Sequence, residues 1–226
     1  MLRLALAVAR KDLTLTLARS AGLIQALLLG LLLLFMFSLS RRAGDLVEPQ
    51  VAATIFWLAS VFCLVLVFNT LFSYEESAGQ RTGLLLLPAP VTGIWLGKAV
   101  AGFLLVLVGQ LLFIPASVIF LGQEIAGDPL MGLTSLMLVD VGLAAVGALL
   151  GALAQGQAAR ESLLSLVIFP LLVPLLLAGI TLLSTLFGDT STEGAAASWL
   201  GFAAAFDAVF LGASLLLFRF IYSGED

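Results

Sequence analysis

The chain has 226 residues, of which 62% are hydrophobic and 11% are charged. Soluble domains carry about 25% charged residues, so this composition excludes an ordinary soluble domain and indicates an integral membrane protein in contact with lipid. The formal net charge is −4 and the cations are not clustered, which excludes a nucleic-acid-binding class. The absence of histidine excludes histidine ligation of metal or haem within the chain, and the single cysteine, Cys63, excludes an intrachain disulfide.

Residues 1–19 have the pattern of a helix that lies on the membrane surface. Arg3, Arg10 and Thr14 fall close together on a helical wheel, with leucines beside them. Such a face suits a helix at the inner membrane interface. The LTLTL stretch within this segment alternates as a strand does, so the pattern also allows an extended conformation.

Six apolar runs are each long enough to cross the hydrocarbon core, which needs about 20 residues. Backbone groups in lipid must pair within their own segment, and runs such as LLLGLLLLF lack the alternation of membrane strands, so helices are expected. The sequence therefore predicts an all-α integral membrane protein, with one transmembrane domain over residues 1–226. The predicted spans are approximately 21–39, 51–73, 99–121, 131–153, 163–186 and 199–220.

The distribution of cations predicts the orientation of these spans. An even number of spans places both termini on one side, and that side carries eight of the ten cations. The opposite side carries only Arg41 and Arg42. Because cytoplasmic loops are rich in Lys and Arg, both termini and the loop 74–97 are predicted to be cytoplasmic.

The loop 74–97 contains the unusual stretch EESAGQRTGLLLLPAPV. Its two acids could occupy the first turn of a helix, its leucine run offers an apolar face, and Pro88 and Pro90 end the helix. We expect a short cytoplasmic helix that dips into lipid or docks into a groove on another protein. Trp95 and Lys98 are expected to anchor the following span at the membrane surface.

The stretch GIWLGKA around Lys98 is similar to a phosphate-binding loop but does not satisfy its pattern. That motif needs four residues between its glycines and a Ser or Thr after the lysine, whereas this chain has three residues and Ala99. The chain is therefore not expected to bind ATP by this route.

Prolines and glycines punctuate the later spans. Pro115 lies in the third span, and Pro170 and Pro174 lie in the fifth, where each is either a static kink or a hinge. Gly147 and Gly151 in the fourth span have the spacing that permits close helix packing, either within the chain or across a dimer.

Two acids lie inside predicted spans, Asp140 in the fourth and Asp207 in the sixth. Each costs about 2.5–3.5 kcal/mol at a helix centre, so intramembrane acids are candidates for a polar path, a subunit contact or a structural hydrogen bond. No Lys or Arg lies at matching depth, and no serine, lysine or histidine constellation accompanies the acids. They do not indicate a hydrolase.

Three stretches together resemble one family over essentially the whole chain. They are LFSYEESAGQRTGLLLLPAPVTGIWLGKAVAGFLL, AARESLLSLVIFPLLVPLLLAGI and WLGFAAAFDAVFLGASLLLFRFI. The chain resembles the B subunit of the bacterial cytochrome c maturation system, the CcmB family. The resemblance implies an ABC-2-type permease in the bacterial inner membrane.

Several partners follow from this resemblance. It implies a second copy of the chain, cytoplasmic subunits that bind ATP, a tryptophan-rich haem-handling membrane subunit and a small single-span subunit. Haem would be the substrate of the complex, with no cofactor bound by this chain itself. The loop between spans two and three would be a coupling helix, with an apolar knob in the ATPase groove and charged residues at its rim. The knob residues are Leu84, Leu85, Leu86 and Leu87, and the rim residues are Glu75, Glu76 and Arg81.

Other functions remain open on the sequence. An ABC-2-type permease for a lipid or a drug would use the same loop, and a non-transporting membrane assembly subunit is also compatible. An enzyme of lipid metabolism would need an acidic metal- and phosphate-binding motif at one interface, and none is present. In each remaining interpretation the chain is not an enzyme, and ATP hydrolysis belongs to a partner.

Overall fold

The computed structural model describes residues 1–40, 47–77, 90–154, 160–191 and 193–223, and the regular structure in these ranges is entirely helical. Six of its helices are long and apolar enough to cross a membrane, which confirms the predicted all-α class with six spans. The elements are α1 (Leu2–Ala18), α2 (Ala21–Leu39), α3 (Pro49–Ser77), α5 (Thr92–Leu121), α6 (Pro129–Leu153), α7 (Arg160–Leu186), the short 3₁₀ helix η1 (Glu193–Ala195) and α8 (Ala196–Ser223).

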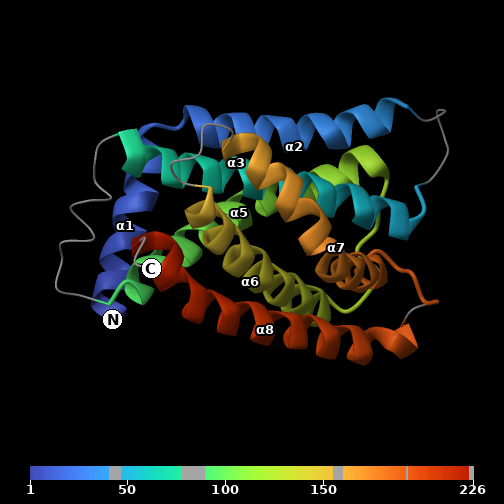
Figure 1. Ribbon diagram of the computed structural model, residues 1–226. Coiled ribbons are helices and arrows are strands. Elements are labelled where there is room, and N and C mark those ends of the chain that lie inside the picture. Colours follow the sequence, from blue (N-terminus) through green and yellow to red (C-terminus); the bar gives the residue numbers. More distant parts are fainter. Residues whose placement is uncertain (41–46, 78–89, 155–159, 192, 224–226) are drawn as a thin grey trace.

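The long helices form a bundle, and α1 lies across one end of it (Figure 1). The end of α3, the start of α5 and the last turns of α8 lie at this same end, which we call the α1 end. The start of α1 and the end of α8 are therefore on one side of the bundle, as an even number of spans requires. The helical conformation of α1 continues through the LTLTL stretch, so the strand alternative was wrong, and its place at the membrane interface stays a prediction.

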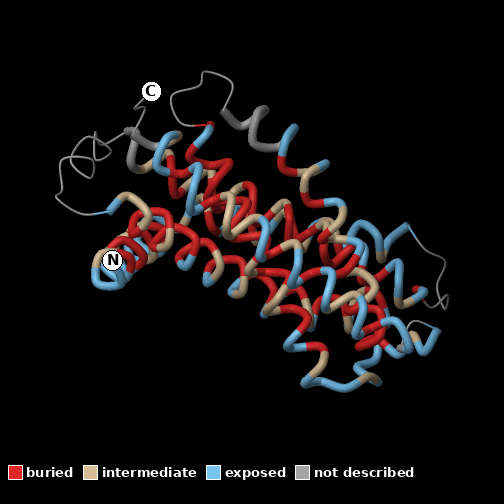
Figure 2. The backbone as a smooth tube through the Cα atoms, turned by 60° about the horizontal axis from the view of Figure 1, so that its bottom comes forward, coloured by how far each residue is buried: buried red, intermediate tan, exposed pale blue. Residues whose placement is uncertain are grey.

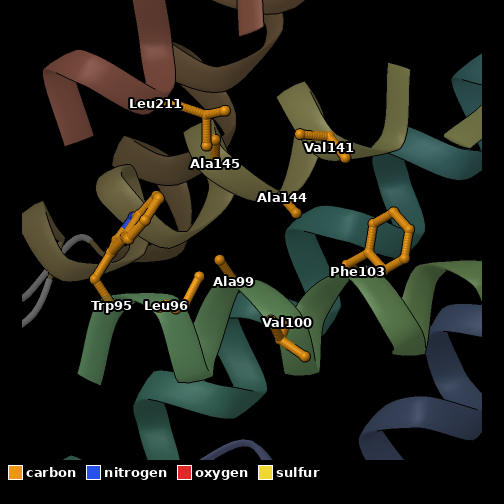
Figure 3. A pocket seen from close by; sticks show the side chains of 9 residues that line it. All are labelled: Trp95, Leu96, Ala99, Val100, Phe103, Val141, Ala144, Ala145 and Leu211. Carbon is orange, nitrogen blue, oxygen red and sulfur yellow. The ribbon is translucent and has the colours of Figure 1, made fainter. Parts of the chain in front are cut away.

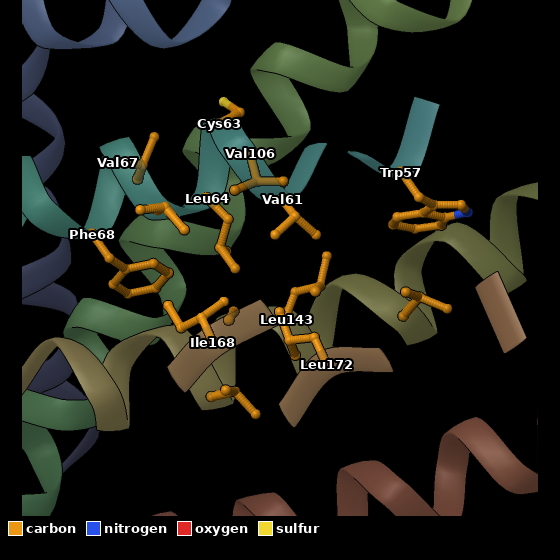
Figure 4. Close-up of a cluster of buried hydrophobic side chains, with 14 of the residues drawn as sticks. Trp57, Val61, Cys63, Leu64, Val67, Phe68, Val106, Leu143, Ile168 and Leu172 are labelled. Carbon is orange, nitrogen blue, oxygen red and sulfur yellow. The ribbon is translucent and has the colours of Figure 1, made fainter. Parts of the chain in front are cut away.

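The two helices at the centre of the bundle are α3 and α6, whereas α2 and α8 expose most of their apolar residues on the outside (Figure 2). Side chains of α3 pack against α5, α6 and α7 in the core (Figure 4). Examples are Phe68 and Leu64 of α3 beside Leu143 of α6 and Leu172 of α7, all fully buried. The remaining apolar surface is available to lipid.

Glycines bring α6 against α3 within the chain. A Cβ atom at Gly147 would clash with the ring of Phe68, and one at Gly151 would clash with the ring of Phe72. The ring of Phe68 also occupies the space beside Gly102 of α5. The close packing predicted for the two α6 glycines is thus used inside one chain, because an aromatic ring of α3 fills the space that a side chain at each glycine would need.

At the opposite end of the bundle, the loop between α5 and α6 caps the last turn of α7. Ala126 and Gly127 donate backbone hydrogen bonds to the carbonyl of Leu186. Just beyond α7, Asp189 accepts hydrogen bonds from the hydroxyl and the backbone N–H of Ser191. The Ser191 hydroxyl is the main cause of a lowered pKa of the Asp189 carboxyl group.

The main difference from the predicted ranges lies between spans two and three. Helix α5 begins at Thr92 instead of near residue 99, and α3 continues to Ser77. Trp95 and Lys98 are consequently buried inside the first turns of α5, with 2% and 0% of their surface exposed. The expectation that these two side chains lie at the membrane surface was wrong, because Lys98 pairs with Asp12 of α1 and Trp95 lies between α5, α6 and α8.

Candidate functional site

The predicted coupling segment is described only at its flanks. Arg81 and the leucines 84–87 lie outside the described residues. Glu75 and Glu76 belong to the last turn of α3, which places their backbone at the α1 end of the bundle. The described site therefore consists of the end of α3, the start of α5 and the helix α1 beside them.

A buried ion pair joins α1 to α5 at this point. The Nζ atom of Lys98 lies 3.3 Å from Oδ2 of Asp12. Both side chains are buried, with exposed fractions of 0% for Lys98 and 3% for Asp12. The other carboxylate oxygen of Asp12 lies 2.9 Å from Nζ of Lys11, whose side chain is 30% exposed.

The same ammonium group also contacts the end of α3. Lys98 donates a hydrogen bond of 3.3 Å to the carbonyl of Leu71 and lies 4.4 Å from the centre of the Phe72 ring. A lysine has three N–H donors, and a buried ion pair is tolerated only when the remaining donors find partners. The carboxylate, the carbonyl and the aromatic ring together meet that requirement, so this one side chain of α5 contacts both α1 and α3.

A second contact fixes the turn between α1 and α2 to α3. The hydroxyl of Tyr74 donates a hydrogen bond of 3.1 Å to the carbonyl of Arg19. The guanidinium of Arg19 lies 5.4 Å from the centre of the Tyr74 ring, within the range of a cation–π contact. We call Asp12, Arg19, Leu71, Phe72, Tyr74 and Lys98 the α1 junction.

The local sequence explains why α1 comes so close to α5. Gly93 and Gly97 are four residues apart on the face of α5 that meets α1. A Cβ atom at Gly97 would lie 2.7 Å from the carbonyl oxygen of Ala5 and from Cβ of Val8. The stretch compared above with a phosphate loop is a small-xxx-small packing motif, and this spacing was the signal that could have revealed the contact.

The intramembrane acid Asp140 belongs to a buried polar chain across three helices. The amide nitrogen of Gln110 in α5 donates a hydrogen bond of 2.8 Å to Oδ1 of Asp140 in α6, and it lies 3.4 Å from the hydroxyl oxygen of Ser60 in α3. Within the described residues, Oδ2 of Asp140 and Oε1 of Gln110 have no hydrogen-bond partner. The sequence marked Asp140 by its charge, but its two neutral partners gave no comparable signal.

Asp207 belongs to α8 and packs against a different face of α6 from the one that carries Asp140. Its carboxylate occupies the space beside Gly142, where a Cβ atom would also approach Leu175 of α7. Gly142 is two residues after Asp140, or about 200° around the helix. Both acids are buried, at 1% and 4% exposure, and so face protein instead of lipid. The structure does not bring them together into one site.

The described polar side chains around Asp140 form hydrogen bonds with one another. Among the described residues, no three histidine, cysteine or acidic side chains gather to hold a metal. Pro115 lies inside α5, and Pro170 and Pro174 lie inside α7, so each interrupts the ladder of a continuous helix. Their role as hinges stays a prediction.

An apolar groove of about 280 Å³ lies between α5, α6 and α8, near the α1 end (Figure 3). Its walls carry almost no polar surface, so it suits an apolar group. The lining residues are Trp95, Leu96, Ala99, Val100, Phe103, Val141, Ala144, Ala145 and Leu211.

Comparison with known proteins places these features in a family. The model of the CcmB protein family matches residues 3–220. The chain belongs to the CcmB family. A relative, heme exporter protein B of Haemophilus influenzae, is 28% identical over 172 residues, which cover 76% of this chain and 77% of the relative. The matched range includes the α1 junction and, apart from Leu2 and Ile221, the whole of α1 and of the six candidate spans.

Proposed function

We propose that this CcmB protein is the membrane subunit of a haem-exporting ABC transporter for cytochrome c biogenesis, in which a partner subunit binds and hydrolyses ATP. The match to the CcmB family over nearly the whole chain carries this proposal. The name of the relative, heme exporter protein B, supports haem as the substrate of the complex. The six candidate spans suit a permease.

Coupling to ATP is assigned to the segment between α3 and α5. Glu75, Glu76 and Arg81 would contact the rim of the ATPase groove, and the leucines 84–87 would fill it. The α1 junction supports this assignment, because it ties together the two helices that flank the segment. ATP is left to the partner, since Lys98 of the GIWLGKA stretch is engaged in the junction.

Haem is assigned to a partner subunit instead of this chain. Thiolate is one of the side chains that can ligate haem iron. The thiol of Cys63 is fully buried in the packed core, beside Gly109 of α5.

The complex would contain two copies of this chain and two ATP-binding subunits. A tryptophan-rich membrane subunit would hold haem and a small single-span subunit would accompany it. ATP hydrolysis would then serve haem export or the release of haem-loaded chaperone.

The coupling assignment is tested by replacing Leu85 and Leu86 with aspartate. Each leucine on a docking face contributes about 1.5–3 kcal/mol of apolar burial, and the substitutions also bury charge, so the ATPase should be lost from pull-downs. A matched control replaces Gln80 and Thr82 with aspartate, which adds the same charge and keeps the leucines. Full recovery of the ATPase by the leucine variant, with cytochrome c maturation intact, contradicts the assignment.

In the proposed orientation the chain lies in the bacterial inner membrane. Both termini and residues 74–97 are on its cytoplasmic side. A cysteine introduced at Gln80 in a Cys63→Ala background should be protected from an impermeant thiol reagent in intact cells. A cysteine introduced at Arg41 should react. The reverse pattern would exclude this orientation.

A further inference from the structure

We propose that Lys98 and Asp12 are positioning residues that lock α1 to the end of α3 and the start of α5, the two flanks of the proposed coupling segment, so that α1 and these two flanks move together as one rigid lever. The inference rests on the proposed coupling function and adds a second moving part to it. The movement of the segment would reach the first span through α1, in addition to spans two and three.

The first observation is the convergence of three helices on one ammonium group. Lys98 of α5 meets the carboxylate of Asp12 in α1 and the carbonyl of Leu71 in α3, each at 3.3 Å. The segment 78–89 connects α3 to α5, so any displacement of it acts on both of these helices. A fully buried charge shared between them opposes their separation, because separation would leave the ammonium without its partners.

The second observation is the way α1 is held. It packs chiefly on α5 and makes far fewer contacts with α2 and α3. Its buried stripe contains Ala5, Val8 and Ala9 together with Asp12, and the backbone of Ala5 lies directly over Gly97. The side chain of Val8 also packs against Gly97, so this contact leaves little free volume in which α1 could slide along α5. We therefore expect α1 to follow α5.

The third observation connects α1 to the first span. Only Arg19 and Ser20 separate the end of α1 from the start of α2. The carbonyl of Arg19 is held by the hydroxyl of Tyr74, in the last turns of α3. A displacement of α1 therefore acts on α2 through a two-residue connection that is itself fixed to α3.

A disulfide provides a direct test of the rigid lever. A Cβ atom at Gly93 would lie 3.5 Å from Cβ of Leu4, within the range of about 3.5–4.5 Å that disulfides adopt. The variant Leu4→Cys with Gly93→Cys, in a Cys63→Ala background, should therefore cross-link α1 to α5. Because the two helices move together, oxidation should leave both ATPase activity of the complex and cytochrome c maturation at the level of the reduced protein. Loss of maturation on oxidation would overturn the proposal.

The second arm removes the ion pair without leaving a buried charge. In the double variant Asp12→Leu with Lys98→Met, the complex should assemble and hydrolyse ATP, but matured cytochrome c per ATP hydrolysed should fall at least about fivefold. Adding the Leu4–Gly93 cysteine pair and oxidising it should restore this ratio. A disulfide between Gly22→Cys and Thr70→Cys, which joins α2 to α3 at a Cβ separation of 3.6 Å, should not restore it.

The outcomes separate this inference from the proposed function. If wild-type chain does not co-purify with an ATPase, or if its loss leaves cytochrome c maturation intact, the proposed function fails and the inference falls with it. If wild type behaves as proposed, normal coupling in the Asp12→Leu, Lys98→Met variant overturns the inference alone. So does rescue by the control disulfide, or failure of the Leu4–Gly93 disulfide to rescue.

Discussion

Removing the carboxylate of Asp12 should destabilise the chain more than removing the ammonium of Lys98. The two residues form one ion pair, but each keeps different contacts when its partner is removed. Asp12→Ala removes the carboxylate that pairs with the fully buried Lys98, whose contacts with the carbonyl of Leu71 and the ring of Phe72 carry no opposite charge. Removing one partner of a buried ion pair costs about 3–5 kcal/mol.

Lys98→Met should cost less, because Asp12 keeps its contact of 2.9 Å with the partly exposed Lys11. The loss is then that of one hydrogen bond to a charged group, about 1.5–3 kcal/mol. Replacing both members by apolar residues of similar volume, Asp12→Leu with Lys98→Met, should be close to neutral, since no buried charge remains unpaired. The expected order of destabilisation is Asp12→Ala, then Lys98→Met, then the double variant.

The assay can use the chain's own cysteine. Cys63 is the single cysteine and is fully buried, so a thiol-reactive fluorophore reports unfolding in detergent without further engineering. With about 2–4 °C per kcal/mol for a chain of this size, Asp12→Ala should lower the midpoint by about 6–20 °C and Lys98→Met by about 3–12 °C. A double variant as unstable as Asp12→Ala would refute the electrostatic reasoning. Equal losses in the two single variants would refute the role given to Lys11.

Two further pairs of variants test packing and the intramembrane polar chain in the same assay. Gly127→Ala should destabilise the chain by about 1–3 kcal/mol, because its Cβ would clash with the backbone carbonyl of Thr185. The control Gly201→Ala, where nothing lies within 4 Å of the added Cβ, should be neutral or stabilising. An equal loss of stability in the control would contradict the packing argument. Gln110→Leu should cost about 1–3 kcal/mol by leaving Asp140 without its donor. Asp140→Asn should cost less than Gln110→Leu, since the asparagine keeps an oxygen that can accept the hydrogen bond from Gln110, and the opposite order would exclude this hydrogen-bond assignment.

Long apolar runs were sufficient to predict the spans, because crossing lipid demands about 20 apolar residues whatever the tertiary packing. The start of α5 could not be predicted in this way. Residues 92–98 form helix in contact with α1, where another helix takes the place of lipid. The span was predicted to begin after Lys98 because a lysine inside hydrocarbon is costly, and the local sequence does not show that Asp12, 86 residues earlier, pairs with it. The ion pair joins residues far apart in the sequence, so neither segment by itself predicts it.

The sequence also did not predict which face of each span packs against protein. Helices such as α3 and α6 are apolar all round, so periodicity does not say which side meets protein. The cost of a carboxylate in hydrocarbon did predict that Asp140 or Asp207 faces protein, and both do. It could not name Gln110 as a partner, because the amide lies on another helix and carries no charge to mark it.

The packing of α3 gives the proposed coupling a physical route into the membrane. One end of this helix meets Lys98 through Leu71 and Phe72. One turn earlier, the ring of Phe68 is enclosed between Gly102 of α5 and Gly147 of α6. A ring seated in two glycine notches leaves no free volume, so the end of α3 cannot shift without moving α6 or leaving a void. Force applied at segment 78–89 would therefore pass to the centre of the bundle through α3, while the α1 junction passes it to the outer helix α2.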